Sequence, residues 1–152
     1  MITFAYGANL DVGRMRALAP AIRFLGRAYL PDHAPGFTVI FDGIPGEDAI
    51  EALGSRLWGV LYELPDGPQA EALDASEGIA YASLPYRRER RSVITETGAR
   101  VDAWLYLANR TGDYEPDRAY VANVLDWARF WNLPPEHLTR LEHHLSRARD
   151  WR

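Results

Sequence analysis

The sequence lacks two residue types that carry much enzyme chemistry. It contains no cysteine, which excludes thiol nucleophiles, disulfides and cysteine-ligated zinc. All 17 basic residues are arginine. The absence of lysine excludes Schiff-base chemistry and both the Walker and the kinase-type lysine. Whatever the chain does must therefore rest on carboxylates, hydroxyls, histidines, arginines or backbone groups.

Long hydrophobic runs are also missing. No apolar stretch approaches the ~20 residues that a membrane span needs. The first residues carry neither a basic segment nor an apolar core of the kind seen in signal peptides. The sequence therefore predicts a cytoplasmic protein with no membrane partner.

Positive charge is scarce, and the net charge is −4 over 152 residues. An acidic surface loses the main electrostatic driving force for binding nucleic acid. The basic run 87–91 falls on an expected strand, where alternating side chains divide the charges between two faces, so a solvated edge strand is the favoured interpretation. We therefore expect no nucleic-acid partner.

Histidines are few, and none of the four has the spacing of a metal site. No serine stands in the G-x-S-x-G pattern of many hydrolases. We therefore expect no metal and no cofactor. Length and an apolar content of 47% are typical of a single globular domain, here residues 1–152.

Hydrophobic periodicity predicts about six strands and a helical tail. Strands are expected at residues 2–6, 22–30, 37–41, 57–64, 86–94 and 101–107. The Gly/Pro/acid-rich stretch 43–54 is expected to be a loop, and a short helix capped by Asn9 or Asp11 should end before Pro20. Apolar stripes predict two helices after Pro116. The fold class is therefore α+β, built on a mixed sheet or a small β-barrel, and periodicity alone does not choose between the two.

A glycine loop joins the first expected strand to the first helix at residues 6–10. Unpaired backbone N–H groups at such a junction can bind an anion or an oxyanion. An ordinary tight turn with an asparagine cap explains the same residues. On local physics alone the ordinary turn is favoured, because such junctions are common.

Glu77 stands at the expected end of a short helix, immediately before Gly78. There it faces the negative pole of the helix dipole, and Tyr81 and Tyr86 follow closely. Both surroundings disfavour the charged carboxylate and would raise its pKa toward that of a general base. A solvated surface glutamate is the alternative, and it is again favoured on local physics alone.

Several short segments together carry a resemblance to one known family. In chain order they are Tyr6-Gly7-Ala8-Asn9-Leu10, Leu57-Trp58-Gly59-Val60-Leu61-Tyr62, Leu73-Asp74 with Glu77-Gly78, Tyr86-Arg87-Arg88, Tyr106-Leu107, and a tail with Tyr120, Ala128, Asn132-Leu133-Pro134 and Leu138. Each is weakly specific, but their order and spacing fit over nearly the whole chain. The sequence thus resembles the γ-glutamylcyclotransferase family.

The resemblance implies a small mixed-strand β-barrel with flanking helices and a C-terminal helix pair. It implies Glu77 as the catalytic acid/base, and a pocket for a small-molecule γ-glutamyl substrate. It further assigns substrate binding to Tyr6, Gly7, Ala8, Asn9, Leu10 and Tyr106. One departure is Ala8, where the family usually carries serine or threonine, so a hydroxyl contact to substrate is absent.

Three functions stay open at this point. The first is cyclisation of γ-glutamyl amino acids or dipeptides to 5-oxoproline by attack of the substrate's own α-amino group. The second is the same chemistry on a γ-glutamyl amine or a carrier-linked biosynthetic intermediate. The third is a barrel that binds a small metabolite without converting it, although such a binder gains nothing from a carboxylate at an unfavourable helix end. The roles of Tyr81 and Tyr86 and the oligomeric state, a homodimer included, are left open.

Overall fold

A closed, mixed β-barrel forms the body of the protein. Residues 1–79 and 84–152 are described by the structure, which is a computed structural model. The strands are β1 (Ile2–Ala5), β2 (Arg23–Phe41), β3 (Ile44–Glu63), β4 (Tyr86–Thr95) and β5 (Arg100–Ala108). They close in the order β1, β3, β2, β4, β5, with β1 antiparallel to β3 and parallel to β5. Of the two architectures that periodicity left open, a mixed open sheet and a small barrel, the protein forms the barrel.

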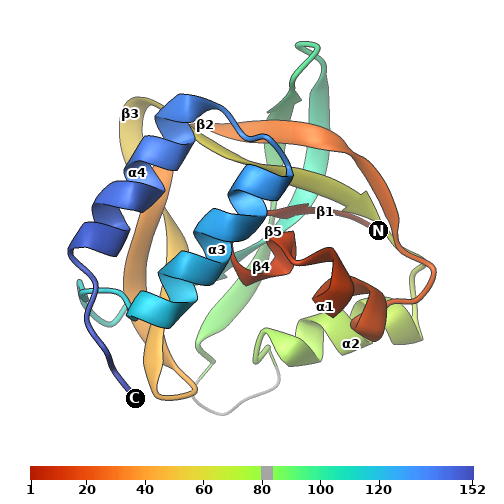
Figure 1. Ribbon diagram of the computed structural model, residues 1–152. Helices are drawn as coiled ribbons and strands as arrows, with labels where there is room; N and C mark the ends of the chain where they lie inside the picture. The colour runs from red at the N-terminus through yellow and green to blue at the C-terminus, as the bar shows by residue number, and fades with distance from the viewer. Residues whose placement is uncertain (80–83) are drawn as a thin grey trace.

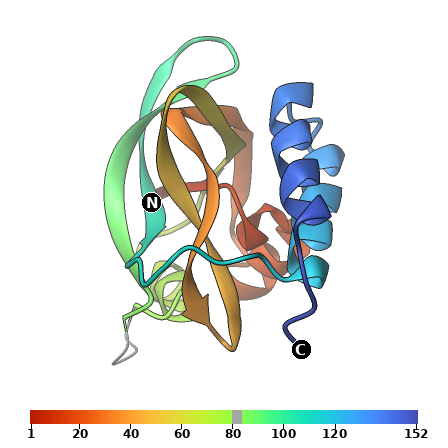
Figure 2. The same ribbon diagram turned by 90° about the vertical axis from the view of Figure 1, so that its left-hand side faces the viewer.

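Helices cover one side and one end of this barrel. They are the short 3₁₀ helix η1 (Ala8–Leu10), α1 (Val12–Leu18), α2 (Pro68–Ser76), α3 (Arg118–Phe130) and α4 (Pro135–Ser146). Helices α1 and α2 lie together at one end (Figure 1), and α3 and α4 form a layer beside the barrel (Figure 2). Among the described residues, no helix has the length and apolar character needed to cross a membrane.

Strands β2 and β3 form one long antiparallel ribbon, which corrects two sequence predictions. The predicted strands 22–30 and 37–41 are parts of β2, which continues through register shifts. The stretch 43–54 is mostly strand β3 and not a loop. Its backbone pairs with residues 33–41 of β2 across a tight turn at Asp42 and Gly43, both of which have positive φ. Pairing with a neighbouring strand therefore overrides the loop-like composition of this stretch.

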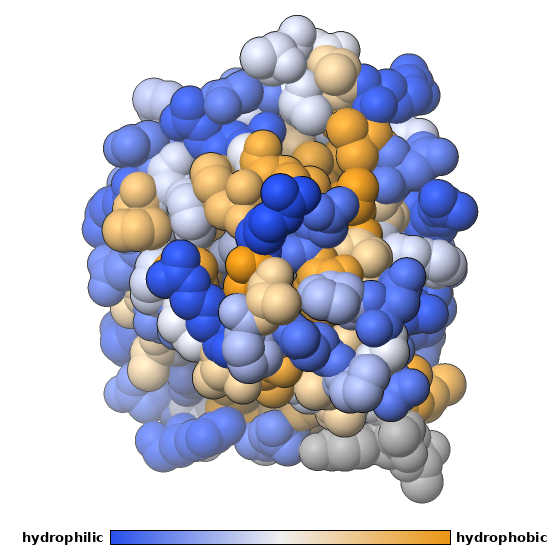
Figure 3. Space-filling view, turned by 90° about the vertical axis from the view of Figure 1, so that its right-hand side faces the viewer, coloured by the Kyte–Doolittle hydropathy of each residue, from blue (hydrophilic) through white to orange (hydrophobic). Residues whose placement is uncertain are grey.

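Two apolar clusters hold the fold together. One fills the barrel and includes Phe4 of β1 and Tyr6 directly after it, which pack in the same cluster as the alternation predicts. The other packs the helices against the barrel and contains the predicted α3 stripe, Val121, Val124, Leu125 and Ala128. On the outside, hydrophobic and charged side chains are interspersed on the face viewed from the α1–α2 side (Figure 3).

Candidate active site

A small pocket opens where the loop after β1 meets the end of α2. Loop residues 6–9 form one part of its wall. The other polar groups come from Glu47 on β3, Glu77 after α2, Tyr86 on β4, Tyr106 on β5 and Tyr120 on α3. The pocket is therefore lined by residues from distant parts of the chain, from the loop after β1 to α3. Most of the residues singled out from the sequence meet here.

The loop itself is fixed by hydrogen bonds at both ends. The buried Tyr6 hydroxyl donates to the backbone oxygen of Tyr106 at 2.6 Å. Asp11 caps α1 by accepting from the backbone N–H of Arg14 at 3.1 Å, which leaves the Asn9 side chain for another role. Leu10 lies fully buried in the core, and its backbone oxygen accepts from the Trp131 indole at 2.8 Å. Leu10 thus anchors the loop, and its side chain is not part of the pocket wall.

Glu77 is a partly buried carboxyl and not a solvated surface group. Its backbone ends α2, and Gly78 follows with a φ of 73°. The Asn9 amide donates to Glu77 Oε1 at 2.5 Å. Burial raises the pKa of Glu77, while the Asn9 hydrogen bond and the nearby Arg14 partly oppose that rise. A carboxyl with a raised pKa is better suited to accept and return a proton than an ordinary surface glutamate.

Four tyrosines surround the pocket. Tyr106 donates its hydroxyl proton to Asp74 Oδ1 at 2.6 Å, and Tyr86 donates to the backbone oxygen of Glu47 at 2.7 Å. Burial raises the pKa of Tyr6, Tyr86, Tyr106 and Tyr120, so all four stay neutral hydroxyls at physiological pH. The pocket therefore has aromatic walls, as the sequence around Glu77 predicts. Tyr81, also named in that prediction, lies outside the described residues.

Glu47 is the pocket residue that the sequence did not reveal. It is only 3% exposed, although it lies in the stretch expected to be a loop. Its side chain shares the pocket with Gly7, whose added Cβ would stand 3.2 Å from Glu47 Oε1. Tyr120 was noticed only as part of a family motif, and its hydroxyl lies equally close to Gly7. Pairing of residue 47 with Phe37 of β2 would have revealed both the strand and its buried face.

No three His, Asp or Glu side chains within residues 1–79 and 84–152 are grouped so as to hold a metal ion. The pocket is thus a constellation of two carboxyls, four phenols and a backbone loop. Such groups can transfer protons and orient a polar ligand.

The sequence that forms this fold and pocket matches the model of a known family. The model of the gamma-glutamyl cyclotransferase, AIG2-like family matches residues 3–129. The chain belongs to this family. In this cyclotransferase-family chain the match runs from β1 into α3 and thus includes every residue named in the pocket. No curated protein sequence matches the chain.

Solved structures share the fold of this family member. A gamma-glutamyl cyclotransferase superposes with a TM-score of 0.84 at 23% identity, covering 93% of this chain and 86% of the other. YkqA from Bacillus subtilis gives 0.79 at 24% identity, covering 99% of this chain but 55% of its own. A yeast gamma-glutamyl cyclotransferase specific to glutathione gives 0.70 at 11% identity, covering 98% and 96%. These likenesses confirm the predicted barrel with flanking helices.

Proposed function

We propose that the protein converts a γ-glutamyl amide to 5-oxoproline and a free amine. The observation that carries this proposal is the Glu77 carboxyl, which has a raised pKa and is bonded to loop residue Asn9 inside the tyrosine-lined pocket. Family membership and the absence of any need for a thiol or lysine in this chemistry support it.

The reaction needs one group that moves a proton twice. The substrate's α-amino nitrogen attacks the γ-carbonyl carbon, so that a new C–N bond closes the five-membered ring. Glu77 takes the proton that this nitrogen loses and returns it to the leaving nitrogen as the original amide C–N bond breaks. Holding the two ends of one substrate at ~3–3.5 Å makes the attack intramolecular. Stabilisation of the oxyanion that forms on the γ-oxygen is assigned to backbone N–H groups of the loop at residues 7–9.

A substrate panel tests the proposal directly. The purified protein is incubated with γ-glutamyl amino acids, γ-glutamyl amines and glutathione, which is included because the yeast structural neighbour is described as specific to it. Formation of 5-oxoproline from any of them, lost in Glu77→Gln, is the expected result. Tight binding of a γ-glutamyl compound with no 5-oxoproline would instead identify a binding protein.

A further inference from the structure

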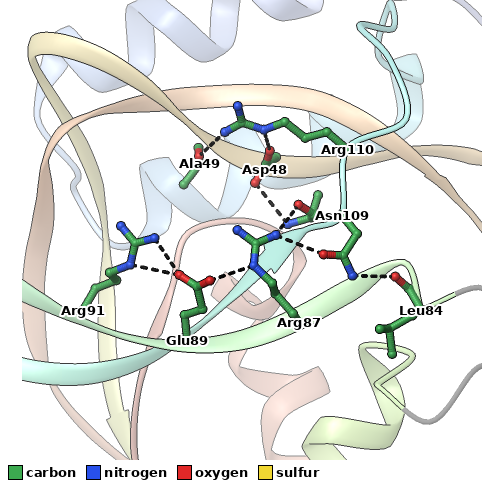
Figure 4. A network of polar contacts seen from close by, with 9 residues as sticks. Asp48, Ala49, Leu84, Arg87, Glu89, Arg91, Asn109 and Arg110 are labelled. Carbon is green, nitrogen blue, oxygen red and sulfur yellow. Dashed lines mark hydrogen bonds and ion pairs between the residues drawn. The ribbon is translucent and has the colours of Figure 1, made fainter.

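Two neighbouring acidic residues on β3 have opposite surroundings. Strand alternation directs Glu47 and Asp48 to opposite faces. Asp48 is fully paired, since it accepts hydrogen bonds from Thr38 Oγ1 at 2.9 Å, the Ala108 N–H at 3.1 Å and Arg110 Nε at 2.7 Å. Figure 4 shows its bonds to Arg110 and to the strand beside it. Asp48 is thus a structural anchor of the barrel wall.

Glu47, by contrast, has no such partner. Both of its carboxyl oxygens are buried without a hydrogen bond, and no arginine among the described residues pairs with it. A buried carboxyl that lacks donors costs the fold free energy, so its retention in a pocket points to a partner that arrives with the ligand.

The backbone at Glu47 is held in place by a neighbouring strand. The Tyr86 hydroxyl bonds the backbone oxygen of Glu47, and Gly46 leaves room for this ring, because an added Cβ there would stand 2.3 Å from the hydroxyl. On the loop side, Gly7 lies against Glu47 Oε1. The carboxyl is therefore fixed against the same loop that the proposed function assigns to substrate binding.

The groups around the Glu47 carboxyl are three neutral hydroxyls, Tyr6 after β1, Tyr86 on β4 and Tyr120 on α3. Asp48 on the opposite face of β3 adds negative charge, and the nearest cation, Arg14, acts on Tyr120 and Glu77. Glu77 adds to the negative potential felt by the same three tyrosines. A cationic donor is the ligand group that this environment favours most, since an anion would meet the negative potential of Asp48 and Glu77.

We propose that Glu47 is a specificity-determining residue that binds an ammonium group of the substrate, separately from proton transfer by Glu77. This inference rests on the proposed function, because a γ-glutamyl compound carries such a group on its α-carbon. A second source is a cationic amine half, as in a γ-glutamyl diamine. Burial and the neighbouring Asp48 raise the pKa of Glu47, and a bound ammonium group would oppose that rise by stabilising the charged carboxylate.

The test measures binding in Glu77→Gln, so that ligands are not converted. Four probes separate the two sources of the ammonium group. They are L-glutamine, its des-amino counterpart 4-carbamoylbutanoate, the γ-glutamyl derivative of 1,4-diaminobutane, and that of butylamine. Calorimetry gives Kd for Glu77→Gln and for the same variant with Glu47→Gln added.

Loss of a charge-assisted hydrogen bond weakens binding about ten- to hundredfold. Recognition of the α-ammonium predicts this loss for the three probes that carry an α-amino group, with 4-carbamoylbutanoate unaffected. Recognition of the amine half predicts it for the diamine derivative alone. Glu51→Gln, an exposed glutamate on the same strand, is the matched control and should change nothing.

Equal weakening of all four probes, or of none, overturns the inference. A fold defect is recognised by the thermal midpoint, and Glu47→Ala must then reproduce the same selectivity among the probes. If the wild type forms 5-oxoproline while Glu47→Gln shows no selectivity, the Glu47 inference alone fails. If no probe binds and no 5-oxoproline forms, the proposed function fails with it.

Discussion

Asn9 connects the loop after β1 to the carboxyl at the end of α2, through its 2.5 Å hydrogen bond to Glu77. The orientation of the Asn9 amide follows from its second bond, in which Arg14 Nε donates to Asn9 Oδ1 at 3.1 Å. The amide nitrogen is thus left to face Glu77. The contacts from Arg14 to Asn9 and from Asn9 to Glu77 orient the Glu77 carboxyl and limit the rise in its pKa.

The first prediction concerns Glu77 itself. Glu77→Gln keeps the size of the side chain but cannot accept a proton, so kcat should fall about 10²–10⁴-fold. The thermal midpoint should change little, since the amide can keep a hydrogen bond to Asn9. Glu71→Gln, an exposed change on the same helix, is the control. A Glu77→Gln rate above half that of the wild type would remove Glu77 from the mechanism.

Asn9→Ala should shift the pH dependence of the reaction. The hydrogen bond from Asn9 favours the charged carboxylate, so its loss raises the pKa of Glu77 further. The ascending limb of kcat/KM against pH should therefore move to higher pH. Asn109→Ala, which removes an amide of the polar network in Figure 4, should leave the limb in place. An unchanged limb in Asn9→Ala would show that the bond does not tune Glu77.

Two glycines should respond differently to alanine. A Cβ on Gly7 would stand 3.1 Å from the Tyr120 hydroxyl, so Gly7→Ala crowds the pocket and should lower kcat/KM with little loss of stability. A Cβ on Gly59 would stand 2.1 Å from the Ala5 backbone oxygen, so Gly59→Ala should cost about 1–3 kcal/mol of stability or more. Denaturant titration and steady-state kinetics on both variants check the contrast. A kinetically silent Gly7→Ala would make the loop a structural turn only.

Ala8 stands where the family usually carries a hydroxyl side chain. Since Ala8 lines the pocket, Ala8→Ser adds a group that can reach a ligand. We expect the variant to fold normally and to bind substrate as well or better, by up to about 0.5–1.5 kcal/mol. KM and, in the Glu77→Gln background, Kd measure the effect. Weaker binding would mean that the pocket is adapted to the smaller side chain.

Burial of His137 should make the stability of the fold depend on pH. It is fully buried in α4 with both ring nitrogens unpaired, and burial lowers its pKa to about 4. The unfolded chain binds a proton near pH 6.5, so stability is unaffected above that pH and falls as the pH drops toward 4. The loss from this group is about 3 kcal/mol.

Unfolding titrations between pH 7.5 and 4 on wild type and His137→Leu test this dependence. The variant should lose less stability than the wild type over this range, whereas His143→Gln, an exposed change on the same helix, should follow the wild type. Parallel curves for His137→Leu and wild type would contradict the prediction.

Local patterns predicted the elements whose burial repeats regularly along the chain. The strand around Trp58, buried at every residue from 57 to 62, and the α3 stripe, which buries one helix face, are examples. The family motifs predicted the pairing of Glu77 with the first loop. Sequence patterns did not predict the strand at 44–54 or the burial of Glu47. Both depend on pairing with β2 and not on the composition of the segment itself. Barrel closure depends on a contact between Thr3 and Trp104, which no local pattern contains.

The hydrogen bond from Trp131 to the Leu10 backbone oxygen has a consequence for synthesis on the ribosome. The loop is translated before every barrel strand but β1, yet its anchor Trp131 and the Tyr120 wall are translated more than a hundred residues later. Through most of translation the nascent chain can pair β2 with β3 but holds an unfinished pocket. Competence to bind ligand therefore arises late, and a ribosome stalled before α3 would display a ribbon without a working site.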